Sequence, residues 1–207
     1  MLVKRAALDR AYEASGAYLA KVWSTYRDVP VQDHVRAILA AVDRALPERV
    51  GSAVLRELVD VYARPALIVP PTVDDGARAA LETLRERGHT LALISNTMRT
   101  PGATLRKLLT HYGLLACFAH TTFSDEVGLR KPDPEIFYQT LRAVGGDAET
   151  SVHVGDDSLL DVQGARTAGM KVIQVTAGAG GRSGVTPDAV IPRLAALPAA
   201  ITELEAR

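Results

Sequence analysis

Beyond Pro70 the sequence alternates between short apolar runs and segments with helical spacing, and this alternation restricts the fold more than any other feature. The apolar runs are TLALIS, CFAHTTFS, SVHV, KVIQVT and AVI. Strands that alternate with helices are joined by crossover connections and form a parallel sheet that is covered on both faces. The sequence therefore predicts an α/β fold with a doubly wound parallel sheet.

The first 64 residues show helical spacing only. In DHVRAILAAVDRAL the apolar residues recur at intervals of three and four, which is typical of an amphipathic helix. Asp33 stands where it would cap this helix, and Pro47 falls near its end. We predict a helical domain over residues 1–64 and an α/β domain over residues 65–207.

Composition excludes several classes of function. The 207 residues contain 24 basic and 24 acidic side chains, and this balance lacks the basic excess of a nucleic-acid-binding protein. No apolar run approaches the ~20 residues that span a membrane, and charges interrupt any signal-peptide core. The single cysteine, Cys117, allows no internal disulfide, which fits a reducing compartment. The sequence predicts a soluble cytoplasmic protein without a nucleic-acid or membrane partner, and it leaves the oligomeric state open.

Polar residues follow two of the predicted strands, at the edge of a parallel sheet where ligands bind. They are Ser95 and Asn96 after LALI, and Asp156, Asp157 and Asp161 after VHVG. Lys131, next to Pro132, lies in the loop between them. Hydroxyl and amide donors, one ammonium group and several carboxylates match a phosphate group together with Mg²⁺, which prefers oxygen ligands.

Each of these residues also has a simpler explanation. Ser95 and Asn96 are typical of a strand-to-loop cap, and an isolated lysine such as Lys131 is usually solvated. Asp156 and Asp157 are well placed to cap the following helix, whose amino end favours negative charge. Only the order and spacing of all these residues together favour a phosphoryl-transfer site.

The sequence resembles the haloacid dehalogenase-like hydrolases. LALISNT is similar to the second motif of that family, GLRKPDPEIF to the third, and HVGDDSLLDVQGARTAGM to the fourth, in its GDxxxxD form. The helical region 1–64 resembles the small helical cap of the family's phosphatase-type members. The resemblance thus covers nearly the whole chain and implies a capped α/β core.

The resemblance also implies roles for individual residues. Ser95 binds the substrate phosphate through its hydroxyl group and Asn96 supplies a neighbouring donor. Lys131 is the cation of the site. Asp156 is the Mg²⁺ ligand, and Asp161 either supports the metal or pairs with Lys131. Asp157 occupies a position where the family accepts serine or aspartate, so its role is the least defined.

The family's first motif, an apolar strand ending in DxDx[TV], is absent from the sequence. Its first aspartate attacks phosphorus, and its second acts as general acid and base. The pair Asp74–Asp75 is an unsuitable substitute, because adjacent residues of an extended segment point to opposite sides. In the family this strand lies between those that end here in Ser95 and Asp156. We expect the strand and its nucleophile to lie upstream of Met1, with natural loss of the strand as the alternative.

The predicted function is that of a hydrolase, a Mg²⁺-dependent phosphatase that acts on a small phosphorylated metabolite through an aspartyl-phosphate. A non-catalytic relative that binds a phosphorylated ligand or a partner protein is the alternative, and dehalogenase or phosphomutase activity stays open. Without a nucleophile, the 207-residue chain itself is expected to have negligible hydrolytic activity. The natural substrate is not predicted.

Overall fold

The structure is a computed structural model that describes residues 4–176 and 184–206. The chain divides into two compact units, each built from several stretches. Unit 1 consists of residues 1–71, 96–108 and 123–130, and unit 2 of residues 72–95, 109–122 and 131–207. The division into domains at residues 64 and 65 rests on periodicity alone and stays a prediction.

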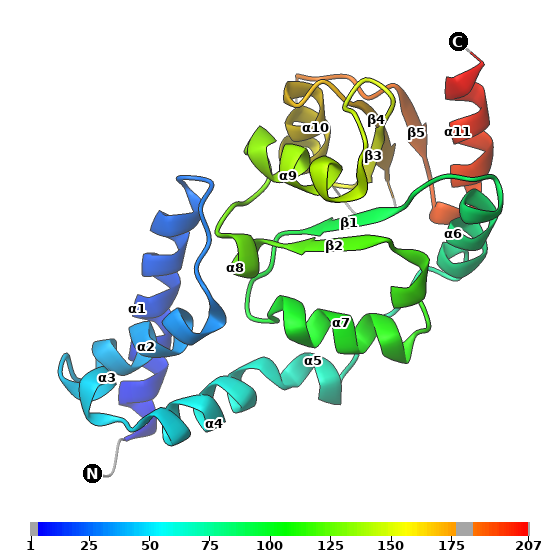
Figure 1. The fold of residues 1–207 in the computed structure, drawn as a ribbon. Coiled ribbons are helices and arrows are strands. Elements are labelled where there is room, and N and C mark those ends of the chain that lie inside the picture. The colour runs from blue at the N-terminus through cyan, green and yellow to red at the C-terminus, as the bar shows by residue number, and fades with distance from the viewer. Residues whose placement is uncertain (1–3, 177–183, 207) are drawn as a thin grey trace. The chain divides into compact units, whose positions relative to one another are not determined.

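Unit 1 is helical. The helices of its first stretch, up to residue 71, are coloured blue to cyan in Figure 1. Its helices include α1 (Arg5–Trp23), α2 (Val31–Val42), α3 (Leu46–Arg49), α4 (Ser52–Ala63), α5 (Pro65–Ile68) and α8 (Ser124–Val127), and α7 (Gly102–His111) begins in it. Helix α2 packs on α1 and on α4. Leu19, Val35 and Leu55 are buried, one from each of these three helices. The apolar residues that recur at helical spacing in the sequence therefore include the residues through which these helices pack.

The predicted ends of α2 were wrong. The helix begins at Val31 directly after Pro30, so Asp33 lies in its first turn and makes no capping hydrogen bond. A proline just before the helix pre-sets its backbone and needs no donor of its own. The helix ends at Val42, and Pro47 lies at the start of the separate helix α3.

Unit 2 contains the strands. They are β1 (Ala92–Ser95), β2 (His120–Phe123, whose last residue belongs to unit 1), β3 (Val152–Gly155), β4 (Lys171–Val175) and β5 (Ala189–Ile191). Strand β1 pairs with β2, and a second sheet has the order β3–β4–β5. In the second sheet all pairs are parallel, with Val154 opposite Ile173 and Ile173 opposite Ala189. The α/β architecture with parallel strands is confirmed.

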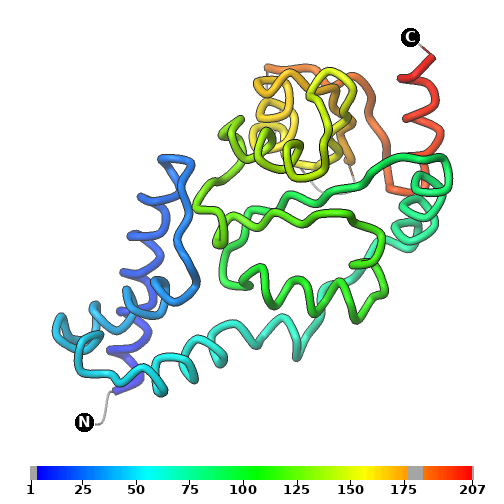
Figure 2. Tube along the Cα trace, in the orientation of Figure 1, coloured from blue at the N-terminus to red at the C-terminus, as the bar shows by residue number. Residues whose placement is uncertain are grey.

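Helices cover both faces of the β3–β4–β5 sheet. The helical elements of unit 2 are α6 (Ala77–Glu86), η1 (Leu115–Cys117), α9 (Pro134–Val144), η2 (Ser158–Gln163), α10 (Gly164–Thr167), η3 (Leu194–Ala196) and α11 (Leu197–Glu205). Ile173 packs with α6 and α11 in one apolar cluster, and these two helices lie side by side (Figure 2). The next residue back, Val172, points to the opposite face, where η2 and α10 contact β4.

His34 of α2 is the most unusual buried residue of unit 1. Its ring is 1% exposed and lies edge-on to Trp23 and Tyr62, with ring centroids 6.3 and 6.0 Å away. Neither ring nitrogen has a hydrogen-bond partner among the described residues. Burial lowers the pKa of His34, because a charged ring would lose its hydration there.

We predict that His34→Phe makes unit 1 less sensitive to acid. A histidine whose pKa is lowered by folding contributes stability above its unfolded pKa of 6.5 and loses it as the pH falls below that value. The variant should flatten the fall in unfolding free energy below that pH by up to about 1.4 kcal/mol per pH unit. Urea unfolding near pH 7 and near pH 5 measures this, with exposed His111→Phe as the control. An unchanged pH dependence contradicts the assignment.

Candidate active site

The carboxyl end of β3 delivers the acidic residues of the GDxxxxD segment. Asp157 caps the helical segment that follows, because its Oδ1 atom accepts hydrogen bonds from the backbone N–H groups of Leu159 and Leu160, both at 2.8 Å. The Asp156 side chain is exposed, and it has no hydrogen-bond partner in the described part of the chain. The Asp157 carboxylate is thus engaged in hydrogen bonds to the backbone, whereas the Asp156 carboxylate is accessible to solvent.

Asp161 lies at the centre of a buried cluster in unit 2. Its Oδ1 atom accepts from Lys131 Nζ at 2.5 Å and from His153 Nε2 at 2.9 Å, and its Oδ2 atom accepts from the backbone N–H of Asp157 at 3.0 Å. The carboxylate packs directly against Gly155, where any Cβ atom would collide with it. The glycine of this segment is therefore required by the close approach of Asp161.

The surroundings keep Asp161 ionised and His153 neutral. Burial alone would raise the pKa of Asp161, but the hydrogen bond from His153 and the charge of Lys131 outweigh it and hold that pKa below its usual range. Burial lowers the pKa of His153, whose ring lies edge-on to Phe137 at 5.0 Å. The neutral His153 ring therefore donates a hydrogen bond from its Nε2–H group to the Asp161 carboxylate.

Lys131 also reaches the end of β1. Its Nζ atom lies 3.4 Å from the carbonyl oxygen of Ile94, the residue before Ser95. One ammonium group thus connects the ends of β1 and β3 inside unit 2, as the positions of the motifs suggested. Asn96, the next residue along the chain, belongs to unit 1.

The donor set fits a hard divalent cation that keeps most of its waters. No group of three or more histidine, cysteine, aspartate or glutamate side chains that could hold a metal exists among residues 4–176 and 184–206. Asp161 is paired with Lys131, which leaves Asp156 as the open carboxylate. A hard divalent cation can be held by one or two carboxylates together with substrate phosphate and water, and Asp156 is the open carboxylate here.

A second buried network, in unit 1, has no counterpart in the sequence motifs. The side chain of Asp28 is fully buried and forms an ion pair with Arg130 Nη1 at 2.7 Å. It also accepts hydrogen bonds from Trp23 Nε1 at 2.9 Å and from Ser124 Oγ at 2.5 Å. The Val29 N–H and the Thr97 hydroxyl also donate to this carboxylate, at 2.9 and 3.4 Å, and these five contacts offset the cost of burying its charge.

This network holds two chain segments that continue into the site of unit 2. Arg130 Nη1 donates to the carbonyl oxygen of Thr97 at 2.6 Å, and Ser124 Oγ accepts from the Thr97 N–H at 2.7 Å. Thr97 is two residues beyond Ser95, and Arg130 directly precedes Lys131. The only local signal for these contacts is the position of Arg130 beside the KPDP segment, since the partners are distant in sequence.

Comparison with known proteins gives the family. A family model described as haloacid dehalogenase-like hydrolase matches residues 4–169. The chain belongs to the haloacid dehalogenase-like hydrolases. As a member of this family it also matches solved structures over most of their length. A 2-haloacid dehalogenase from Pseudomonas syringae is 24% identical with a TM-score of 0.60, and the match covers 96% of this chain and 92% of that one. At this identity the likeness shows the fold alone.

Several curated relatives carry phosphatase names. A phosphoserine phosphatase from Thermus thermophilus is 37% identical over 59% of this chain and 47% of its own length. A phosphoglycolate phosphatase from Cupriavidus necator is 35% identical over 71% of this chain and 61% of its own. A haloacid dehalogenase-like hydrolase domain-containing protein 3 from Mus musculus is 35% identical, with 64% and 53% covered. The matches span about half the length of these relatives.

In the part that the structure describes, no helix is long and apolar enough to cross a membrane.

We predict that Asp161→Asn destabilises unit 2 strongly, because it leaves the Lys131 ammonium group buried without its countercharge. The side chains of Lys131 and Asp161 are only 11% and 5% exposed, and breaking such a pair costs about 3–5 kcal/mol. The matched control is Glu135→Gln, which breaks the exposed pair with Arg142 and should cost less than about 1 kcal/mol. Urea unfolding measures both, and equal effects would rule out a buried ion pair.

Proposed function

We propose that the protein is a Mg²⁺-dependent phosphatase that acts on a small phosphorylated metabolite through an aspartyl-phosphate. The observation that carries the proposal is the Lys131 ammonium group, held between the end of β1 and the carboxylate of Asp161. A fixed cation at this edge stabilises the negative charge of a transferring phosphoryl group. The phosphatase names of the curated relatives support the same reaction class.

In this proposal the chain's own residues bind and orient the phosphate. The Ser95 hydroxyl donates a hydrogen bond to a phosphate oxygen, and Lys131 neutralises the charge of the phosphate. Asp161 is a positioning residue, since its pairing with Lys131 fixes the ammonium group. His153 bonds the same carboxylate oxygen of Asp161 as Lys131 does and helps to keep that carboxylate ionised.

Asp156 is the proposed ligand of Mg²⁺, which when bound offsets charge on the phosphate. An open carboxylate directly after β3 supports this role, and Asp157 is set aside because it caps the next helical segment. The dehalogenase branch of the family needs no metal, so an open carboxylate favours phosphoryl chemistry over dehalogenation.

The attacking aspartate is the remaining part of the mechanism. Asp74, the nearest substitute in the sequence, lies in the turn before α6, where its Oδ1 atom accepts from the Gly76 N–H at 2.8 Å. The attacking aspartate, expected on an apolar strand that ends in DxD, therefore stays a prediction. The alternative, a relative that binds phosphorylated ligands without catalysis, requires no such strand.

We predict that a chain extended upstream of Met1 by an apolar strand ending in Asp-Ile-Asp hydrolyses p-nitrophenyl phosphate in the presence of Mg²⁺. Asp156→Asn in the extended chain should lower kcat/KM about a hundredfold, because the metal loses its protein ligand. Exposed Asp147→Asn is the control and should leave the rate within about twofold. Steady-state kinetics with and without EDTA measure these effects.

Two outcomes contradict the proposal. One is an extended, folded chain without Mg²⁺-dependent turnover, which supports the non-catalytic alternative. The other is strong turnover by the 207-residue chain alone that Asp156→Asn abolishes, since this requires a different nucleophile.

A further inference from the structure

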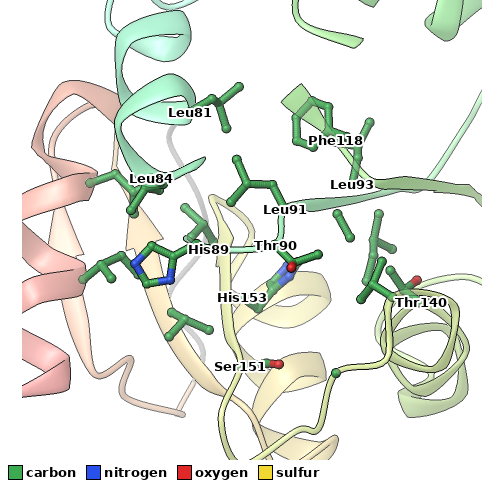
Figure 3. A pocket seen from close by; sticks show the side chains of 18 of the residues that line it. Leu81, Leu84, His89, Thr90, Leu91, Leu93, Phe118, Thr140, Ser151 and His153 are labelled. Carbon is green, nitrogen blue, oxygen red and sulfur yellow. The ribbon is translucent and has the colours of Figure 1, made fainter. Parts of the chain in front are cut away.

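Unit 2 contains a cavity of about 900 Å³ that residues of β1 and β3 line, among them Leu91, Leu93 and His153 (Figure 3). The strand of the family's first motif is expected between β1 and β3, so this cavity belongs to the proposed catalytic core. Unit 1 presents a separate surface that the proposed chemistry does not use. It is the face of α4 that its neighbour α2 leaves uncovered.

Helix α4 has two apolar faces, and only one of them is packed. Leu55 and Ala63 are the buried residues of α4, which contacts α2. Val54, Leu58 and Val61 form the second face, which we call the α4 stripe, because spacings of four and three residues place side chains on one side of a helix. Their exposed fractions are 50%, 36% and 58%. The α4 stripe is therefore open to solvent.

A surface helix normally exposes polar side chains on the side that faces away from its own core. Single exposed apolar residues are common on protein surfaces, whereas a contiguous set of them marks a contact with another molecule. The three residues of the α4 stripe follow one another along nearly two turns of the same helix. The α4 stripe is thus a surface that a partner can cover.

Two charged residues border the α4 stripe and indicate which partner fits it. Glu57 and Arg64 are seven residues apart, almost two full turns, so they lie on the same side of the stripe. The backbone angles of Arg64, φ −73° and ψ −29°, continue the turn of the helix. Both residues are exposed, and neither forms an ion pair within residues 4–176 and 184–206. The border of the stripe therefore carries one charge of each sign.

An antiparallel pair of α4 helices makes these two charges complementary. A two-fold axis that passes between the helices, level with the bond between residues 60 and 61, reverses the residue order and brings the charged borders of the two copies together. Residues 57 and 64 are equally far from that axis. Glu57 of one copy then lies opposite Arg64 of the other, and the reverse pair forms as well. An interface of this kind is closed, so association stops at two copies.

We propose that the α4 stripe is a self-association surface through which two copies of the chain form an antiparallel α4–α4 homodimer. The apolar side chains of both copies leave water, and the two Glu57–Arg64 pairs at the rim fix the direction and the register. One helix from each copy makes a small interface, so we expect a weak, reversible dimer. No phosphate, metal or nucleophile takes part, so the homodimer stands or falls separately from the proposed function.

Sedimentation equilibrium of the 207-residue chain over a range of protein concentrations tests the proposal. A reversible equilibrium between monomer and dimer is expected. Val61→Lys should weaken the dimer at least about tenfold, because its charge would lose water in the interface. Arg56→Glu, at an exposed position on the opposite side of α4, should change the dimer affinity less than about twofold. A chain that is monomeric at every concentration, or a dimer that Val61→Lys leaves intact, overturns the proposal.

Charge exchange tests the antiparallel register. Glu57→Arg alone and Arg64→Glu alone each place like charges opposite one another, and each should weaken self-association about tenfold. An equal mixture of the two variants restores two pairs of opposite charge, so a heterodimer with the affinity of the unchanged chain should form. Circular dichroism checks that both variants are folded. A mixture that associates no better than either variant alone overturns the α4–α4 pairing.

A different occupant of the α4 stripe has its own signature. A chain extended upstream of Met1 could cover the stripe with its added segment. Hydrogen exchange in α4 would then slow at every protein concentration in the extended chain, which would sediment as a monomer. That result assigns the stripe to the upstream segment and overturns the homodimer, whereas protection that rises with protein concentration supports it.

Discussion

The ion pair between Lys131 and Asp161 is the interaction on which the site of unit 2 depends. It connects the loop before α9 to the helical segment after β3, and the same ammonium group reaches the end of β1. Because both partners are almost completely buried, the pair is stable only if its remaining atoms are also satisfied. His153 and the Asp157 N–H meet that requirement, and Gly155 makes room for the carboxylate.

The positions of the polar residues at strand ends and of the proline-flanked lysine follow from the strand–helix alternation and from motif spacing. The roles of these residues in a site stay predictions. His153 was missed, since a polar residue within an apolar strand shows no partner until the fold is known. The Asp28–Arg130 network was missed for the same reason, because its members are 102 positions apart. The start of α2 was misjudged because Pro30 begins the helix earlier than the Asp33 capping pattern indicated.

The two units contribute differently to the proposed function. Unit 2 holds Lys131 and the GDxxxxD acids. Unit 1 buries the charge of Asp28 with Arg130, next in the chain to Lys131. Each buried pair thus stabilises the unit that contains it.

The proposed function requires that Lys131 binds phosphate, which titration of the 207-residue chain with inorganic phosphate in the presence of Mg²⁺ measures. We expect Lys131→Met to weaken phosphate binding by about tenfold or more, because a charge-assisted contact to the anion is lost. Lys107→Met, in α7, should bind phosphate like the unchanged chain. If the Lys131 variant and the unchanged chain are both folded and bind phosphate equally well, Lys131 is not the phosphate ligand.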